Sequence, residues 1–350
     1  MLSASSYHTL VRVSDEGLIY LTRDPINAET PLARQAGIIT PTRLHYVRDH
    51  FAVPDPPDRL VVEGAARTRL QLTLDDIRAL RSRSLVVTLE CAGNGRAYLD
   101  PPTPGEQWRS GAVGTAEWTG VPLRAVLDMA DPSPSAVEVL FVGADEGTPK
   151  EVTRRIAFER SLPIADALES DALLAYAMNG EPLPLENGAP LRLIVPGWYG
   201  MASVKWLARI RLLERPFQGF YQTDRYVIDK RPLREIAPRA LITSPTEGAR
   251  LPVRAFIVRG YVWSGRGEPE RVQVSADGGG TWQDAALSEP ISRYAWREWR
   301  CSVDPRETGA LTLLARVVTK DGETQPLAPV PTALGYANTG AIPVRVTIGA

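Results

Sequence analysis

The pattern of hydrophobic positions along this 350-residue chain predicts many short strands and few helices. Leu85 to Leu89 is an apolar, β-branched-rich run between turn residues, which is typical of a buried strand. Leu173 to Met178 is a similar run, and the Asn179-Gly180 pair that follows it is a strong signal for a β-hairpin. Thirty prolines and 28 glycines also favour turns and strands over a helical bundle.

Three further segments of the first 235 residues have strand patterns. Val137 to Asp145 is apolar and ends on an acid, and Leu191 to Val195 is stopped by Pro196-Gly197. From Val204 to Leu212, apolar residues alternate with charged ones except at Leu207, which predicts a half-buried strand. Residues 1–40 have few periodic signals, and we expect them to wrap around the outside of the first domain.

Short helices are predicted at three places. Thr73 is a typical N-cap and precedes the apolar residues Ile77 and Leu80. Pro122 suits the first turn of a helix that follows it. Ser161 is a plausible N-cap for a helix over residues 161–168.

The composition changes at about Ala237 to strand patterns separated by proline and glycine. The clearest of these predicted strands are Arg254–Val262, Arg271–Ser275, Leu311–Val318 and Val344–Ile348. Ser275 to Trp282 reads as a hairpin turn, and Cys301 as a half-buried strand residue. We therefore predict an α+β fold with a mixed first domain, residues 1–235, and a small antiparallel β-sandwich, residues 236–350.

Composition and charge exclude several classes of function. Apolar content of 44% and charged content of 23% are ordinary for a soluble protein, and a formal net charge of −1 gives no reason to expect nucleic acid or an anionic membrane as a partner. No apolar run approaches the roughly 18 residues of a membrane span. Residues 1–8 lack the pattern of a secretory leader, which predicts a cytoplasmic protein, or a periplasmic one if a leader was removed.

Cys91 is the candidate for chemistry because it ends the strand predicted at Leu85–Leu89. The sequence Ala92-Gly93-Asn94-Gly95 follows it, and two glycines allow a tight turn and leave room for a bulky group near the sulfur. The alternative is a buried structural cysteine. Position and spacing alone leave the two interpretations equal.

The segment Glu90-Cys-Ala-Gly-Asn-Gly-Arg96 closely resembles the cysteine loop of the sulfite oxidase family of molybdopterin enzymes. This resemblance implies that the Cys91 thiolate ligates molybdenum beside the dithiolene of one pterin, so the implied cofactor is Mo-molybdopterin. A soft thiolate suits such a metal.

The resemblance also implies roles for residues before and after this loop. Arg48, Asp49 and His50 correspond to an Arg-Asn-His segment that lines the pterin, and the arginine reaches the substrate anion. Without the resemblance, they would read as a solvated loop. Asp145 corresponds to an acid that contacts the pterin, although a carboxylate at the end of a strand is often only a turn residue.

A long block over residues 173–206 extends the resemblance. It implies that Arg192 and the turn Ser203-Val204-Lys205 hold the pterin and its phosphate, where pattern alone would make these solvated charges. Asn187 stands where sulfite oxidases have a histidine and where related bacterial methionine-sulfoxide reductases have asparagine.

The substrate pocket is expected to draw on residues nearer the C-terminus and on two residues of Gly111–Leu127, a segment that also resembles the family. Tyr226 is the choice for a pocket tyrosine, with Tyr221 as the fallback, and either ring could instead pack in the core. The resemblance favours Trp118 as a pocket wall over a core aromatic and places Thr115 near the cofactor. Leu334 stands where sulfite oxidases have a second substrate-binding arginine.

The expected function is therefore oxidation of sulfite or a related sulfur oxyanion, with electrons passed to an external one-electron acceptor such as a cytochrome. Cys91, Arg48 and Tyr226 are the residues expected to act in catalysis. The resemblance makes the C-terminal part an immunoglobulin-like dimerisation domain and implies a homodimer. Two alternatives are reduction of a sulfoxide or N-oxide, favoured by Asn187 and Leu334, and a scaffold without catalysis, against which the intact cysteine loop argues.

Overall fold

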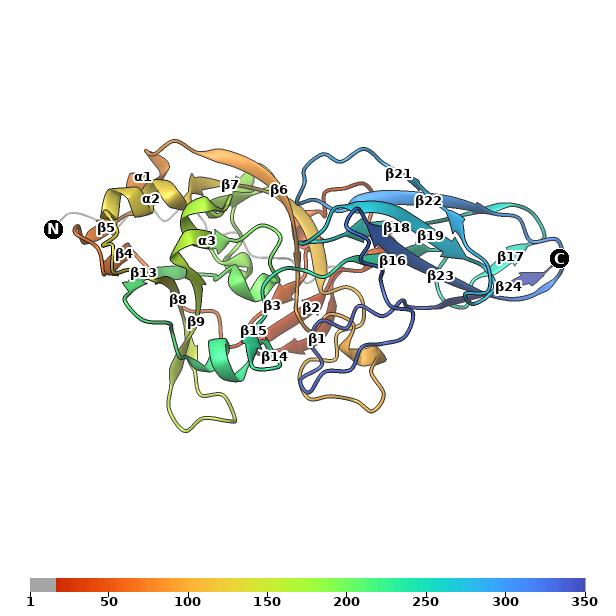
Figure 1. Cartoon of the computed structure of the whole chain (residues 1–350), viewed down its shortest axis with the longest axis horizontal. Helices are drawn as coiled ribbons and strands as arrows, with labels where there is room; N and C mark the ends of the chain where they lie inside the picture. The colour runs from red at the N-terminus through yellow and green to blue at the C-terminus, as the bar shows by residue number, and fades with distance from the viewer. Residues whose placement is uncertain (1–16, 350) are drawn as a thin grey trace.

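The computed structural model describes residues 17–349, and it forms two lobes side by side along the long axis of the molecule (Figure 1). We call residues 17–235 the first lobe and residues 236–349 the second lobe. Residues 1–8, on which the prediction about a leader depends, lie outside the described residues. No helix in the described part of the chain is long and apolar enough to cross a membrane.

Strands dominate the first lobe. A five-stranded sheet has the order β5–β4–β13–β8–β9, in which only β13 and β4 run parallel. Its strands are β4 (Leu60–Gly64), β5 (Leu70–Leu72), β8 (Glu138–Gly147), β9 (Ile156–Pro163) and β13 (Leu207–Leu213). A second, antiparallel sheet has the order β11–β10–β7–β6, with β12 also paired to β10. Its strands are β6 (Arg83–Glu90), β7 (Val113–Pro122), β10 (Leu173–Met178), β11 (Glu181–Pro182) and β12 (Arg192–Ile194).

Two smaller sheets complete this lobe. β1 (Ile19–Arg23), β2 (Ile26–Glu29) and β3 (Val47–Arg48) form a three-stranded sheet, and β14 (Val227–Ile228) pairs with β15 (Arg231–Pro232). The expectation that residues 1–40 wrap around the outside of the first domain missed this pairing: β2 pairs with β1 and with β3, the strand that ends on Arg48, and residues 1–16 lie outside the described part of the chain.

The helices are short: α1 (Leu74–Arg78), α2 (Leu123–Ala130) and α3 (Ile164–Glu169). Thr73 caps α1 as predicted, since its hydroxyl accepts from the Asp76 amide at 3.1 Å. Pro122 precedes α2 as its N-cap. The N-cap prediction for Ser161 was wrong. That residue pairs with Leu140 inside β9, and the helix begins only after Pro163.

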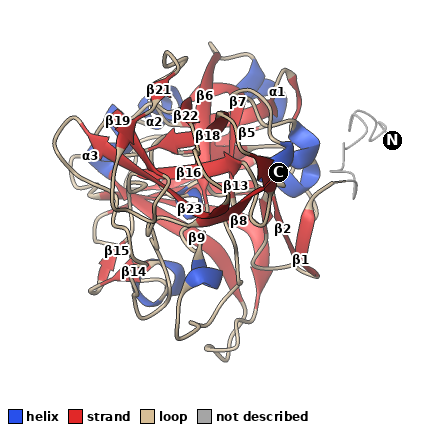
Figure 2. Cartoon of the chain, turned by 90° about the vertical axis from the view of Figure 1, so that its right-hand side faces the viewer, coloured by secondary structure: helices blue, strands red, loops and turns tan. Residues whose placement is uncertain are grey.

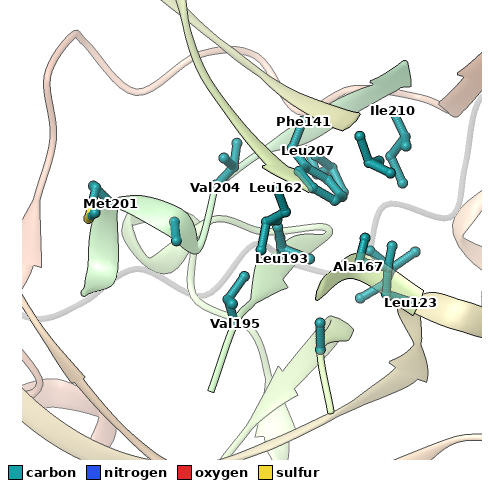
Figure 3. Close-up of a cluster of buried hydrophobic side chains, with 14 of the residues drawn as sticks. Leu123, Phe141, Leu162, Ala167, Leu193, Val195, Met201, Val204, Leu207 and Ile210 are labelled. Atoms are coloured by element: carbon teal, nitrogen blue, oxygen red, sulfur yellow. The ribbon is translucent and has the colours of Figure 1, made fainter. Parts of the chain in front are cut away.

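The core of the first lobe lies between its sheets and these helices. Figure 3 shows side chains from β8, β9, β12, β13, α2 and α3 gathered into one apolar cluster, with Val204 and Met201 at one end of it. The strand predicted from Val204 begins instead at Leu207, because Trp206 has a left-handed backbone with φ of 47°. A bulge between Leu207 and Arg209 accounts for the residue that broke the alternation.

Two sheets build the second lobe (Figure 2). One has the order β16–β18–β22–β21, from β16 (Arg239–Ser244), β18 (Phe256–Trp263), β21 (Ala286–Leu287) and β22 (Arg297–Val303). The other has the order β17–β24–β23–β19–β20, from β17 (Arg250–Pro252), β19 (Pro269–Ser275), β20 (Gln283–Asp284), β23 (Gly309–Thr319) and β24 (Val344–Gly349). Alternate residues of both sheets, such as Val272, Cys301 and Leu313, form a shared buried core, which is the packing of a sandwich.

Candidate functional site

Cys91 lies directly after β6, as the sequence predicted, and begins a tight turn. Its amide donates to the Ala112 carbonyl at 2.9 Å, and its carbonyl accepts from the Asn94 amide at 2.9 Å. Gly95 has φ of 87°, and a Cβ on Gly93 would meet the Arg96 guanidinium at 2.6 Å. Gly95 is therefore required by its left-handed backbone, and Gly93 leaves room for the Arg96 guanidinium that folds over the turn.

The Cys91 sulfur faces a pocket rather than a purely aliphatic core. The pocket has about 640 Å³ of atom-free space, part of it open to solvent. Its lining includes nine predicted site residues: Arg48, His50, Cys91, Asp145, Asn187, Arg192, Ser203, Lys205 and Tyr226. Segments that are distant in sequence thus meet around one thiol, as a binding site requires.

Burial and charge act on this thiol in opposite directions. The side chain is only 7% exposed, and burial raises the pKa of the Cys91 thiol. The guanidinium groups of Arg48 and Arg96 lower it, so positive charge is already directed toward the place where a thiolate would form.

Arg48 is half-buried at the end of β3, with one nitrogen held by the protein. Its Nη1 donates to Asn27 Oδ1 at 3.1 Å and also to the Asp49 carbonyl. Its Nε and Nη2 have no bond to a described residue, and the side chain lines the pocket. An arginine held at one nitrogen can present the others to an anion.

Asp49 and Lys205 form a buried ion pair beside the pocket. Lys205 Nζ donates to Asp49 Oδ1 and to the Glu186 carbonyl, the latter at 2.9 Å. Burial lowers the pKa of Lys205, and the carboxylate of Asp49 opposes this effect. Asp49, which stands where the family has asparagine, therefore has an ionic partner in Lys205. Lys205 is the lysine that was predicted to bind the phosphate of the pterin.

Arg192 organises the backbone under the pocket. Its Nη1 donates to the Asn187 carbonyl at 2.7 Å and its Nη2 to the Ser203 carbonyl at 3.0 Å. The Ser203 hydroxyl accepts from the Val195 amide at 3.0 Å. Val204 does not line the pocket, because its side chain belongs to the apolar core shown in Figure 3.

Two residues expected near the cofactor or substrate do not line the pocket. Trp118 is fully buried behind Arg192, whose guanidinium lies 4.9 Å from its ring centre, so it is a core aromatic and not a pocket wall. Thr115 is also fully buried, and its hydroxyl bonds that of Thr88 at 2.5 Å between β7 and β6. The expectation for Trp118 as a pocket wall was wrong, because no residue of β7 lines the pocket, and the expected proximity of Thr115 to a cofactor remains a prediction.

Tyr226 lines the pocket, whereas the fallback Tyr221 packs behind it. The Tyr226 hydroxyl is 2.5 Å from His50 Nε2, and its backbone is left-handed with φ of 57°. Burial raises the pKa of Tyr226 well above its ordinary value and lowers the pKa of His50 well below its own. Tyr226 is therefore a neutral phenol and His50 a neutral imidazole near pH 7. A single hydrogen bond joins the phenol oxygen to His50 Nε2.

The second lobe packs behind Tyr226 and does not itself line the pocket. Tyr336 stacks on Tyr226 with ring centres 5.0 Å apart, and the Arg96 guanidinium lies 5.2 Å from the Tyr336 ring centre. Arg96 also donates from Nη2 to the Leu334 carbonyl at 3.1 Å. Position 334 thus contributes a backbone carbonyl that holds Arg96, and not a guanidinium that could reach the pocket.

Several residues that the structure brings to the pocket had no role predicted from the sequence. Among them are His45, Tyr46, Phe158, Glu186 and Met201. His45 and Tyr46 stand next to the Arg48 segment, so sequence proximity could have indicated them. Phe158 has no such signal, because it comes from β9 and reaches the site only through the pairing of β9 with β8.

Five buried polar atoms at or beside the pocket have no hydrogen-bond partner among the described residues. They are His45 Nε2, Asp49 Oδ2, Asp145 Oδ1, Asn187 Oδ1 and Arg192 Nε. Buried polar atoms are nearly always paired, so a group with both donors and acceptors is expected here. The ring amide and amino groups of a pterin have this character, and the thiol of Cys91 is a soft donor for a metal held beside it.

The buried carboxyl of Asp145 predicts a dependence of stability on pH. Burial raises its pKa from 3.8 to about 7, although the Lys205 ammonium opposes the shift. Between these values the folded protein keeps a proton that the unfolded chain has lost, so the free energy of unfolding falls as pH rises through this window. Relative to Asp145→Asn, the wild type should lose at most about 4 kcal/mol between about pH 4 and pH 7.

Denaturant unfolding of cofactor-free wild type and Asp145→Asn at about pH 4 and about pH 7.5 measures this difference. We expect the two proteins to differ little at the lower pH and the variant to be more stable at the higher one. Parallel pH dependences would contradict a buried, protonated Asp145.

Comparison with known proteins gives two family matches. Residues 50–221 match the oxidoreductase molybdopterin binding domain, and residues 230–348 match the Mo-co oxidoreductase dimerisation domain. Mitochondrial sulfite oxidase of Mus musculus is 36% identical over 341 residues, which cover 87% of this chain and 61% of that protein. This chain therefore spans less than two thirds of that relative.

For two further relatives, the aligned region covers a larger share of the relative. Sulfite oxidase of Gallus gallus is 34% identical over 359 residues, 92% of this chain and 76% of that protein. The crystal structure of the sulfane dehydrogenase SoxCD from Paracoccus pantotrophus superposes with a TM-score of 0.82 at 28% identity, covering 93% of this chain and 87% of that one.

Proposed function

The chain belongs to the sulfite oxidase family of molybdopterin-dependent oxidoreductases, and from this membership we propose that it oxidises a small sulfur oxyanion, with sulfite as the first candidate. The observation that carries the proposal is the Cys91 thiol facing a pocket with the guanidinium of Arg48. The balanced reaction converts sulfite and water into sulfate, two protons and two electrons, and the electrons pass to an external one-electron acceptor.

The cofactor is Mo-molybdopterin, and we propose that Cys91 ligates its metal while Arg192, Lys205 and the unpaired polar atoms of Asp145 and Asn187 hold its pterin. When bound, molybdenum supplies oxygen-atom transfer coupled to a two-electron change at the metal. The protein supplies orientation and charge. Asp49 is proposed to act indirectly, by holding the Lys205 ammonium in place.

Arg48 and Tyr226 are proposed to act on the substrate. The free edge of the Arg48 guanidinium orients the anion through charge-assisted hydrogen bonds. The Tyr226 phenol, whose pKa is well above its usual value, stays protonated and donates a hydrogen bond to a substrate oxygen. His50 fixes the direction of that hydroxyl through its Nε2 atom.

We further propose the division at residues 235/236, with an immunoglobulin-like second domain through which two copies of the chain form a homodimer. The two-sheet packing of the second lobe and its match to a dimerisation domain support this. Light scattering of the purified protein would measure the predicted dimeric mass.

Reduction of a sulfoxide or N-oxide is the second candidate function. The neutral amide of Asn187 and the absence of a guanidinium at Leu334 favour it over a site specialised for a dianion. The two directions are separated by steady-state assays, with sulfite plus an artificial acceptor against a sulfoxide plus a reduced dye.

Metal analysis of protein from a host that makes molybdopterin tests the proposal and its non-catalytic alternative together. We expect about one molybdenum atom per chain and faster turnover with sulfite than with any sulfoxide. A metal-free protein that keeps its fold would instead support a scaffold, and faster sulfoxide reduction would support the second candidate.

A further inference from the structure

The loop that carries Cys91 lies at the interface between the two lobes. After the thiol, the Ala92 carbonyl accepts from the Ala337 amide at 2.8 Å, and the Gly95 carbonyl accepts from Asn338 Nδ2 at 2.8 Å. Figure 1 shows the connection between β23 and β24 running beside the loop that follows β6. The turn is therefore held from the second lobe as well as from its own sheet.

The strand before the thiol is held in the same way. β6 lies at the end of its sheet and pairs there with β7. Its outer edge is covered by the second lobe, because the Thr88 amide donates to the Tyr294 carbonyl at 2.9 Å and its hydroxyl accepts from the Trp296 amide at 2.8 Å. An exposed edge strand can pair with other chains, and here the second lobe covers that edge.

Between these contacts, Glu90 and Arg239 form an ion pair whose side chains are 3% and 2% exposed. Glu90 Oε1 accepts from Arg239 Nη1 at 3.1 Å and from Asn94 Nδ2 at 2.9 Å, and Oε2 accepts from Trp263 Nε1 at 2.8 Å. Arg239 and Trp263 come from the second lobe, whereas Asn94 belongs to the turn after Cys91. One carboxylate therefore connects the second lobe to the thiol-bearing turn.

We propose that Glu90 and Arg239 are a positioning pair through which the second lobe sets the location of the Cys91 sulfur. Glu90 precedes Cys91, and its carboxylate also anchors Asn94, whose Oδ1 accepts from the Ala112 amide at 3.2 Å. Displacement of a reactive group by about 1 Å is enough to reduce turnover about 100-fold. The inference rests on the proposed function, in which Cys91 ligates the metal.

The cofactor-free protein provides a test that does not depend on activity. Cys91 and Cys301 are the two cysteines of the chain, and both are buried. Alkylation by iodoacetamide, followed by mass spectrometry, measures the rate at each thiol, with Cys301 as the internal reference. A rate–pH profile separates two effects, because the midpoint reports the thiol pKa and the high-pH plateau reports access to the sulfur.

Glu90→Gln and the double variant E90Q/R239M are the informative changes. The double variant leaves no unpaired buried charge, so it should fold even if a single variant does not. We expect the plateau rate of Cys91 to rise about tenfold in both, because the turn opens locally, while the rate of Cys301 is unchanged. A plateau rate equal to that of the wild type in the double variant would overturn the proposal.

Asp171→Asn is the matched control. Asp171 also connects the lobes, through Arg293 at 2.9 Å and the Tyr294 hydroxyl at 2.8 Å, but none of its hydrogen bonds or ion pairs is to residues 90–96. Loss of this connection should leave the alkylation profile of Cys91 unchanged. If D171N raised the plateau as much as E90Q/R239M does, the effect would be general loosening of the lobes, and the positioning role would be rejected.

X-ray absorption at the molybdenum edge of the loaded proteins separates this inference from the proposed function. We expect the double variant to show fewer metal–sulfur bonds, or longer ones, than the wild type, and D171N to match the wild type. Unaltered metal–sulfur distances in the double variant would refute the pair alone. If the wild type and Cys91→Ser gave the same sulfur shell, Cys91 would not be a ligand and the proposed function would fail.

Discussion

Replacement of Cys91 by serine should abolish molybdenum-dependent turnover while the chain keeps its fold. Serine is nearly isosteric, and the side chain sits at the pocket surface of a rigid turn, so little packing is lost. A hydroxyl is a hard and weakly acidic ligand, whereas the site calls for a soft thiolate. Loss of outer-shell partners alone typically costs about 10- to 100-fold in activity, and loss of the ligand should cost more.

Three measurements check this result: the turnover number with sulfite, the molybdenum content, and the circular dichroism of the variant. Cys301→Ser is the matched control. Cys301 is also buried, but it lies in β22 within the core of the second lobe. We expect this control to retain turnover. A Cys91→Ser protein with wild-type activity and a full complement of metal would contradict the assignment of Cys91 as the ligand.

Replacement of Arg48 by glutamine should reduce kcat/KM for sulfite by about 10- to 100-fold, mainly through a higher KM. The size follows from the loss of one or two charge-assisted hydrogen bonds to an anion. Glutamine keeps a donor near Asn27, so the local backbone should be disturbed little. The loss should fall as ionic strength rises, because part of the interaction is a screened attraction.

Arg225→Gln is the control for this change. Arg225 pairs with Glu151 outside the pocket and does not line it, so its loss should leave the KM for sulfite unchanged. A neutral sulfoxide offers no anion for Arg48, and its KM should respond less than that of sulfite. Equal effects on both substrates would show that Arg48 supports the site and does not recognise the anion.

Local features of the fold could be predicted from the sequence because they depend on neighbouring residues: the apolar pattern of a strand, the capping residue of a helix and the residues of a turn. The strand before Cys91, the N-cap at Thr73 and the Asn179-Gly180 hairpin are examples. Ser161 shows the limit of such signals. Its pattern fits an N-cap, but the pairing of β9 with β8 stabilises the extended conformation more than a single cap could stabilise a short helix.

The sequence by itself determined the family, the thiol and most of the residues expected around it, because the motif Glu90–Arg96 and the block at 173–206 carry that chemistry locally. Only the tertiary structure decided which side chains meet. The Asp49–Lys205 pair and the Glu90–Arg239 pair join residues about 150 positions apart. Such contacts depend on the topology of the sheets and the docking of the lobes, and no local periodicity records them.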